Sequence, residues 1–249
     1  MKKFWIGVAL CCSALAQEHK PLTVAAAANL TDVFGEVATK FQAQTGIPVV
    51  LSFGGTANLT MQAEHGAPFD VLAAADVAHI NQLDKEGLLT PESKALYARG
   101  RLALWVPAGS AAHVERVEDL KNGGVKVVAI ANPKLAPYGA AAVESLRKLG
   151  LWGAVGPKVV YAETISAAKQ YAATGNADAA FTAYSLVVRG DGKAIVIPDY
   201  LHAPIDQALG VLKSSEHQGE ARRFVQFLLG PAGREILTRS GYEMPASAP

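Results

Sequence analysis

Short apolar, β-branched runs alternate along the chain with longer stretches in which apolar residues recur at helical spacing. This alternation is typical of an α/β fold with mainly parallel strands. The predicted strands are 22–27, 48–53, 70–74, 102–106, 125–130, 158–160, 179–183 and 207–212. The predicted helices are 30–45, 57–65, 76–86 with Asp76 as cap, 138–149, 166–173, 220–228 and 231–240.

The first and last helices indicate how these elements pack. The helix predicted over 30–45 places Val33, Val37 and Phe41 on one stripe, and Gly46 ends it. The two helices at the C-terminal end have no sheet of their own. We therefore expect them to pack back on the first α/β block.

This packing predicts two lobes. We expect residues 22–101 together with 206–249 to form a discontinuous lobe one, and residues 102–205 to form lobe two. The chain would then cross between the lobes near 101–106 and again near 200–208, and two such crossings make a hinge. Because ligands of open α/β sheets sit at the carboxyl ends of strands, the cleft between the lobes is the expected binding site.

The composition favours a globular protein without a strong electrostatic field. Half of the 249 residues are apolar, and the 23 basic residues nearly cancel the 22 acidic ones. Nothing in this balance steers the chain toward nucleic acid or an anionic membrane. Any anion that the protein binds must therefore be recognised locally.

The first 16 residues have the pattern of a secretory signal peptide. Lys2 and Lys3 form its basic region, an apolar run starts at Phe4, and Ala14 and Ala16 supply an A-x-A cleavage site. A transmembrane anchor is the alternative, but it needs about 20 apolar residues and the run is too short. We expect export to the periplasm.

Both cysteines of the chain lie within this signal. Cleavage after Ala16 would remove Cys11 and Cys12 and leave a mature protein without thiols. Lipid anchoring needs a small residue before the cysteine, and Leu10 precedes Cys11, so a lipoprotein is the less favoured interpretation.

Candidate chemistry gathers where strands give way to helices. Such junctions present unpaired backbone N–H groups at the positive end of a helix dipole, which suits an anion. Four of them look alike and carry no Lys or Arg: Ala28-Asn29, Gly55-Thr56, Pro137-Tyr138 and Thr164-Ile165. Asn29 and Thr56 add neutral side-chain donors. Taken singly, Asn and Thr at these positions are usually simple caps, so only convergence on one cleft would make them a site.

Enzyme signatures are weak. Ser145 with Lys148, and Ser166 with Lys169, match the S-x-x-K pattern of acylating serine enzymes, but the S-D-N and K-T-G partner motifs are missing. The six histidines show no paired-ligand spacing for a metal. A secreted serine hydrolase therefore stays only as a distant alternative.

Several longer motifs resemble one family, and together they cover essentially the whole mature chain. They are LTVAAAANLTD at 22–32, SFGGT at 52–56, GAPFDVLAAAD at 66–76, NPKLAPYG at 132–139 and GPAG at 230–233. The chain resembles the periplasmic molybdate-binding proteins of ABC importers. The resemblance implies the two-lobed type II periplasmic binding protein fold, with the oxyanion held wholly by neutral hydrogen-bond donors.

The resemblance also implies a ligand set. Asn29 and Thr56 match polar residues at the first two helix starts. Tyr138 matches a residue that donates its backbone N–H and, in some members, its phenol, and Ile165 matches an aliphatic residue that donates only its backbone N–H. Some members use a further tyrosine hydroxyl at the position of Ala183, where this chain has none. Our hypothesis is that the phenol of Tyr138 substitutes for it.

The predicted function is capture of molybdate or tungstate and delivery to the membrane permease of an ABC importer. A sulfate or other tetrahedral oxyanion binder of the same fold is the alternative. We expect no cofactor, no bare metal ion, no nucleic-acid partner and no enzymatic activity. We also expect a monomer, because capture of one ion needs no second subunit.

Overall fold

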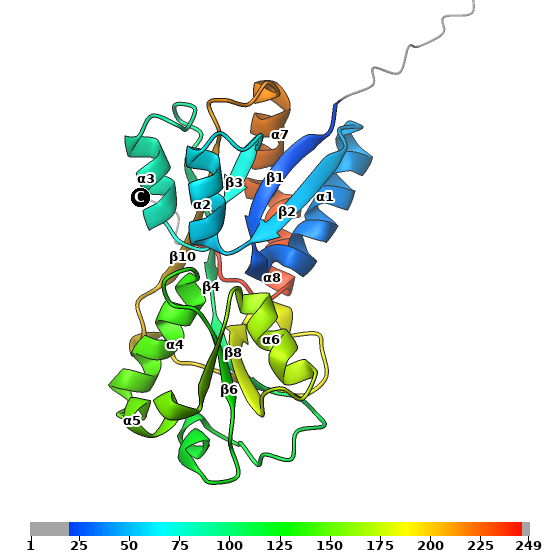
Figure 1. Cartoon of the computed structure of the whole chain (residues 1–249). Helices are drawn as coiled ribbons and strands as arrows, with labels where there is room; N and C mark the ends of the chain where they lie inside the picture. Colours follow the sequence, from blue (N-terminus) through cyan, green and yellow to red (C-terminus); the bar gives the residue numbers. More distant parts are fainter. Residues whose placement is uncertain (1–19, 246–249) are drawn as a thin grey trace, which may run out of the picture.

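The computed structural model describes residues 20–245, which form two α/β lobes, each built on a five-stranded sheet flanked by helices (Figure 1). This is the two-lobed fold that the sequence predicts. The predicted signal peptide, residues 1–16, lies outside the described residues.

The upper lobe of Figure 1 contains the N-terminal strands and the C-terminal helices. Its sheet has the order β2-β1-β3-β10-β4. Its strands are β1 (Leu22–Ala27), β2 (Val49–Gly54), β3 (Val71–Ala73), β4 (Ala95–Gly100) and β10 (Ile205–Val211). Its helices are α1 (Thr31–Thr45), α2 (Thr56–Glu64), α3 (Ala78–Lys85), α7 (Gln218–Leu229) and α8 (Pro231–Arg239), and the short 3-10 helix η1 (Ala28–Leu30) precedes α1.

The lower lobe contains the middle of the chain, and its sheet has the order β7-β6-β8-β5-β9. Its strands are β5 (Leu102–Val106), β6 (Val128–Ala131), β7 (Val159–Ala162), β8 (Ala179–Ala183) and β9 (Lys193–Val196). Its helices are α4 (Pro137–Lys148), α5 (Trp152–Val155) and α6 (Ile165–Ala173). The 3-10 helices here are η2 (Val117–Lys121), η3 (Gly156–Lys158), η4 (Tyr184–Leu186) and η5 (Asp199–Leu201).

Both sheets are mixed. In the upper sheet, β1 pairs in parallel with β2 and β3, whereas β10 is antiparallel to β3 and β4. The lower sheet repeats this arrangement, with β6 parallel to β7 and β8, and β5 antiparallel to β8 and β9. The parallel strands of each lobe lead into helices that start at the interface between the lobes.

Two strands were not predicted, and both are edge strands. In β4, Arg99 interrupts the apolar pattern, and its guanidinium pairs with Asp206 of β10 at 2.6 Å. The other strand, β9, is only four residues long and has no fully buried residue. Edge strands are commonly short and polar, because polar side chains protect the unpaired edge.

The chain passes between the lobes twice. Only Arg101 separates β4 from β5, and residues 197–204 connect β9 to β10. The first passage lies near the predicted position of 101–106, and the second near 200–208. Because β4 and β10 are neighbours in one sheet, the two passages leave the upper lobe close together.

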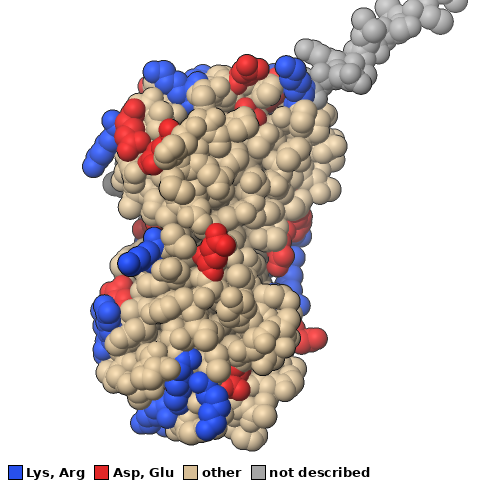
Figure 2. Space-filling model, viewed as in Figure 1, with Lys and Arg blue, Asp and Glu red and all other residues tan. Residues whose placement is uncertain are grey.

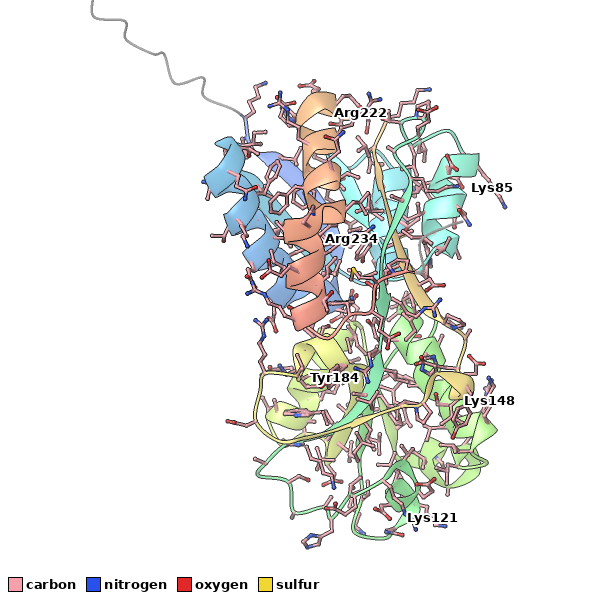
Figure 3. The ribbon with its side chains drawn as sticks, turned by 180° about the vertical axis from the view of Figure 1, so that it is seen from behind. Lys85, Lys121, Lys148, Tyr184, Arg222 and Arg234 are labelled. Atoms are coloured by element: carbon pink, nitrogen blue, oxygen red, sulfur yellow. The ribbon has the colours of Figure 1, made fainter. Side chains whose placement is uncertain are left out.

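The C-terminal helices pack on the first lobe, as predicted, and Figure 3 shows α7 and α8, which carry Arg222 and Arg234, along its back. Phe224 of α7 is fully buried and meets the rings of Phe34 and Phe41 of α1 edge-on, with centroids 6.0 and 5.3 Å apart. Aromatic pairs at these distances and angles are favourable. The predicted stripe on α1 is therefore covered partly by α7.

Candidate functional site

One small pocket at the interface between the lobes brings the predicted site residues together. Asn29, Thr56, Tyr138 and Ile165 all line it. The other lining residues are Ala27, Ala28, Gly54, Gly55, Ala75, Ala136 and Pro137. Four helix starts, two from each lobe, therefore point at one place, which is the convergence that the sequence alone could not establish.

The pocket lining contains no charged side chain. Much of the molecular face in Figure 2 is uncharged as well, and Lys and Arg gather mostly toward its ends and edges. Attraction for an anion at this place therefore depends on backbone N–H groups, helix dipoles and neutral side-chain donors.

Thr56 is the first residue of α2 and is buried. Its hydroxyl oxygen accepts a hydrogen bond from the backbone N–H of Ala75 at 3.1 Å. Among residues 20–245 no acceptor is recorded for the hydroxyl proton of Thr56. Since that oxygen is held as an acceptor, its proton is free to be donated into the pocket.

Asn29 lies in η1, and its side chain is 1% exposed. The amide nitrogen Nδ2 donates to Gln207 Oε1 at 3.0 Å and to the Tyr242 hydroxyl at 2.8 Å. Within the described part of the chain, the amide oxygen Oδ1 is buried without a hydrogen-bond partner. Neither Gln207 nor Tyr242 lines the pocket, so Nδ2 is directed away from it in this arrangement.

Tyr138 is the second residue of α4, after Pro137. At this position its backbone N–H has no acceptor within the helix. The phenol oxygen lies 2.9 Å from Gln207 Nε2, across the interface between the lobes. Burial raises the pKa of the Tyr138 phenol well above its usual range, and the neighbouring Tyr242 raises it further, so the hydroxyl keeps its proton.

Ile165 begins α6, and its side chain is buried. The preceding Thr164 caps this helix by accepting a hydrogen bond from the Ala167 N–H at 3.1 Å. That cap satisfies a later N–H of the first turn and leaves the N–H of Ile165 itself without an acceptor in the helix. An aliphatic residue can thus offer only its backbone here.

The lobes are in contact on both sides of the pocket. The backbone N–H of Ala57 donates to Leu135 O at 3.3 Å, and Asn58 Nδ2 donates to Glu163 Oε1 at 2.9 Å. On the other side, Ser185 Oγ donates to the backbone oxygen of Asn29 at 3.2 Å. The structure therefore describes a closed cleft.

Sequence reasoning missed the buried polar residues behind the pocket. Gln207, Tyr97, Tyr242 and Ser185 form hydrogen bonds with Asn29 or with one another. One signal for them is present in the sequence, because Gln207 is a polar residue directly before the apolar run that ends β10. The tyrosines and the serine give no such signal, since each is distant along the chain from the helix starts.

Neither Ser-Lys pair is arranged for catalysis. Ser145 is fully buried and donates to Ala141 O at 2.8 Å, while Lys148 pairs with Glu144 at 3.0 Å. Lys169 donates to Leu186 O at 2.7 Å and makes no hydrogen bond with Ser166. In neither pair does the structure hold the ammonium group against the serine hydroxyl, as nucleophile activation requires.

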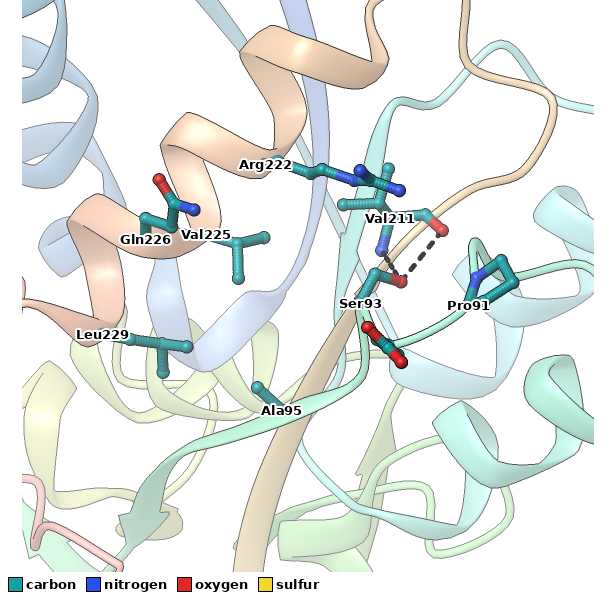
Figure 4. Close-up of a pocket in the computed structure, with 9 residues that line it drawn as sticks. Pro91, Ser93, Ala95, Val211, Arg222, Val225, Gln226 and Leu229 are labelled. Atoms are coloured by element: carbon teal, nitrogen blue, oxygen red, sulfur yellow. Dashed lines mark hydrogen bonds between the residues drawn. The ribbon is translucent and has the colours of Figure 1, made fainter.

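Another pocket lies at the back of the upper lobe, between β4, β10 and α7 (Figure 4). Arg222 and Glu92 both line it, so the carboxylate of Glu92 would repel an anion that the guanidinium of Arg222 attracts. Its Ser93 hydroxyl is already paired, because Ser93 and Val211 hydrogen-bond each other, as the dashed lines show. This pocket gathers no helix starts and is the weaker candidate for an anion.

Within residues 20–245, no cluster of three or more His, Cys, Asp or Glu side chains is placed to hold a metal ion. In the same part of the chain, no helix is long and apolar enough to cross a membrane.

Comparisons with known proteins agree on one group. A family model for bacterial extracellular solute-binding proteins matches residues 22–243. The molybdate-binding protein ModA of Azotobacter vinelandii is 40% identical over 242 residues, which cover 94% of this chain and 92% of the relative. A solved structure of the periplasmic molybdate-binding protein of Azotobacter vinelandii has a TM-score of 0.86 at 31% identity and covers 90% of this chain and 100% of that chain.

The fold is shared more widely than the sequence. The sulfate-binding protein SubI of Mycobacterium tuberculosis H37Rv has a TM-score of 0.78 at 16% identity, covering 92% of this chain and 88% of that chain. At this identity the likeness shows the fold alone.

Proposed function

This chain belongs to the family of bacterial extracellular solute-binding proteins, and from that premise we propose that it captures molybdate between its lobes and delivers it to an ABC importer. The observation that carries the proposal is the meeting of four helix starts in one uncharged pocket. The similarity to molybdate-binding relatives supports the choice of anion.

We assign the anion contacts to Asn29 and Thr56 of the upper lobe and to Tyr138 and Ile165 of the lower lobe. Thr56 donates its hydroxyl proton, while Tyr138 and Ile165 donate backbone N–H groups. A buried dianion without cations is tolerated only if each oxygen receives hydrogen bonds, since burying an unsatisfied ion would cost on the order of several kcal/mol. Because the donors come from both lobes, the anion can contact all of them only when the lobes are closed, so binding and closure are coupled.

Selection by size follows from this arrangement. A closed pocket of fixed dimensions excludes an anion that is too small to reach donors on both lobes at once. Molybdate and tungstate have nearly equal sizes, so we propose that the pocket accepts both and discriminates against sulfate, which is smaller. A sulfate binder of the same fold remains the competing hypothesis, because the fold is common to both.

The test is calorimetric titration of the purified mature protein with molybdate, tungstate, sulfate and phosphate. We expect molybdate and tungstate to bind with one-to-one stoichiometry, and sulfate and phosphate to bind much more weakly or not at all. Preferential binding of sulfate or phosphate would contradict the proposed selectivity.

The Arg222 pocket supplies the control for this test. Arg222→Gln should leave molybdate binding unchanged, because Arg222 does not line the pocket between the lobes. Loss of binding in this variant would move the anion site to the back of the upper lobe.

The cellular setting follows from the same proposal. We place the mature protein in the periplasm, after removal of residues 1–16, as a monomer that needs no cofactor and presents its closed form to a permease. Residues 22–101 with 206–249, and residues 102–205, are the two units that we propose to move about the passages at Arg101 and 197–204.

A further inference from the structure

Gln207 occupies a central position behind the pocket. It lies on β10, is fully buried, and contacts polar groups from both lobes. Its Oε1 lies 3.0 Å from Asn29 Nδ2 and 2.7 Å from the Tyr97 hydroxyl, and its Nε2 lies 2.9 Å from the Tyr138 hydroxyl. The orientation of this one amide therefore decides which of its neighbours must donate.

The arrangement just described has two defects: the Tyr97 hydroxyl makes two close oxygen contacts with a single proton, and one buried acceptor has no donor among the described residues. The Tyr97 hydroxyl has one proton but lies near two acceptors, Gln207 Oε1 at 2.7 Å and the backbone oxygen of Ala74 at 2.9 Å. In addition, Asn29 Oδ1 is buried with no partner among residues 20–245. A buried polar group left unpaired costs about 1–3 kcal/mol.

Turning the two amides of Asn29 and Gln207 together by half a turn exchanges their oxygens and nitrogens and removes both defects. Gln207 Nε2 then donates one proton to Asn29 Oδ1 and the other to the Tyr97 hydroxyl, which donates to Ala74 O. Gln207 Oε1 accepts the proton of the Tyr138 hydroxyl. An amide has two donor protons and an acceptor oxygen, so all these groups are used.

The groups on the far side of Asn29 also fit the turned arrangement. The Tyr242 hydroxyl lies 2.8 Å from the amide atom of Asn29 that faces it and can donate to that atom once it is Oδ1. The Ser185 hydroxyl, 3.2 Å from the backbone oxygen of Asn29, still satisfies that oxygen. No buried acceptor named in this network is left unpaired.

We propose that Gln207 is a positioning residue that turns the amide N–H donors of Asn29 toward the oxyanion pocket. Gln207 and Tyr242 both contact the same atom of the Asn29 amide, and both lie outside the pocket lining. Asn29 itself lines the pocket. The second atom of the amide, which has no partner in the part of the protein that the structure describes, therefore lies on the pocket side, and in the turned arrangement this atom is Nδ2. This inference rests on the proposed function and adds a residue that lies behind the ligand set.

The turned arrangement also assigns the phenol of Tyr138. The phenol donates its proton to Gln207 Oε1 and so holds the Gln207 amide in place. The contact of Tyr138 with the anion is then made by its backbone N–H. This differs from the hypothesis drawn from the sequence, in which the phenol replaced a hydroxyl missing at Ala183.

The amide orientation can be measured without any ligand, by nuclear Overhauser effects from the side-chain amide protons of Gln207 in protein labelled with [15N]glutamine. The Gln207→Met spectrum identifies the resonance. We expect contacts from these protons to the ring of Tyr97. Contacts to the ring of Tyr138, without contacts to Tyr97, would overturn the proposal and leave the proposed function untouched.

The consequence for binding is measured by calorimetry with molybdate on Gln207→Met, which keeps the side-chain length and removes the amide. We expect about tenfold weaker binding, equivalent to about 1.4 kcal/mol, since Asn29 loses the contact that orients it. In [15N]asparagine-labelled wild type, molybdate should shift the side-chain N–H signals of Asn29, and in Gln207→Met this shift should be smaller.

The matched control is Gln170→Met, at an exposed position of α6, which should bind as the wild type does. Unchanged affinity in Gln207→Met, or wild-type protein that binds molybdate with no shift at the Asn29 amide, would overturn the positioning role. Failure of the wild type to bind any oxyanion would instead overturn the proposed function, and the ligand-free measurement on Gln207 would still decide the amide orientation.

Discussion

At the scale of single residues, the proposed site offers neutral hydrogen-bond donors and no charged side chain. Thr56 shows how a side chain is prepared for this: the Ala75 N–H occupies a lone pair of its hydroxyl at 3.1 Å, so the proton is left for the pocket. The sequence could predict which residues at the helix starts offer neutral donors. The direction of each proton could not, because it depends on partners such as Ala75 and Gln207 that lie elsewhere in the chain.

Thr56→Val tests this donor with a side chain of nearly the same shape. We expect molybdate binding to weaken at least about tenfold, as loss of one hydrogen bond to a charged group suggests. A smaller loss of stability should accompany it, because the Ala75 N–H loses its acceptor. Calorimetry and urea denaturation measure the two effects.

The control for this variant is Thr39→Val on α1, where an exposed hydroxyl bonds to the backbone of its own helix. It should leave binding unchanged. Equal affinity of Thr56→Val and wild type would remove Thr56 from the ligand set.

The buried tyrosines give a pH dependence at high pH. Burial raises the pKa of Tyr97, Tyr138 and Tyr242 above their usual value. Below about pH 10 these phenols are protonated in both folded and unfolded chains. Above it the unfolded chain loses these protons and the folded chain keeps them, so the free energy of unfolding falls by up to about 1.4 kcal/mol per pH unit for each tyrosine.

Tyr97→Phe isolates one of these contributions. Between pH 10 and 11, approximately the range above the ordinary tyrosine pKa, the unfolding free energy of this variant should fall less steeply than that of wild type. Urea denaturation at several pH values measures the slope. Identical slopes would show that Tyr97 ionises in the folded protein as easily as in the unfolded chain.

At the scale of elements, most strands and helices could be predicted from the sequence, and the antiparallel edge strands β4 and β9 could not. The strands β1 and β8 were predicted with their observed bounds, because both are mostly apolar runs between clear boundaries. The returning strand β10 was also predicted, but its neighbour β4 was not, since Arg99 breaks the pattern that would have revealed it. The antiparallel half of each sheet depends on pairing across long sequence distances, which periodicity does not report.

The fit between β4 and α4 depends on a glycine at the end of β4. A side chain on Gly100 would overlap the hydroxyl of Tyr138 and crowd Gln207 Nε2. Glycine thus lets the phenol of the lower lobe reach the amide of the upper lobe.

Gly100→Ala should therefore destabilise the closed form. We expect a loss of about 1–3 kcal/mol in unfolding free energy, the usual cost of overpacking, together with weaker molybdate binding. Chemical denaturation and calorimetry measure both. Gly109→Ala is the control, because a Cβ at Gly109 would have no neighbour within 4 Å; equal effects of the two substitutions would contradict this account.

At the scale of the whole molecule, two lobes joined by two passages meet around an uncharged pocket. Two lobes could be predicted from the alternation of strands and helices. The return of the last helices to the first lobe could be predicted because they have no sheet of their own. The closed arrangement could not be predicted, because it depends on contacts such as Ala57 with Leu135 and Ser185 with Asn29, between residues far apart in the chain. Near-neutral net charge is compatible with the proposed function, in which the anion is recognised within the pocket and not by the overall charge of the protein.

The most direct test of the account is a crystal structure of the mature protein grown with molybdate. We predict one molybdate between the lobes, within hydrogen-bonding distance of Asn29, Thr56, Tyr138 and Ile165, and with no Lys or Arg side chain in contact. Molybdate bound at Arg222, or a pocket between the lobes that stays without anion while the protein binds molybdate elsewhere, would contradict the central claim.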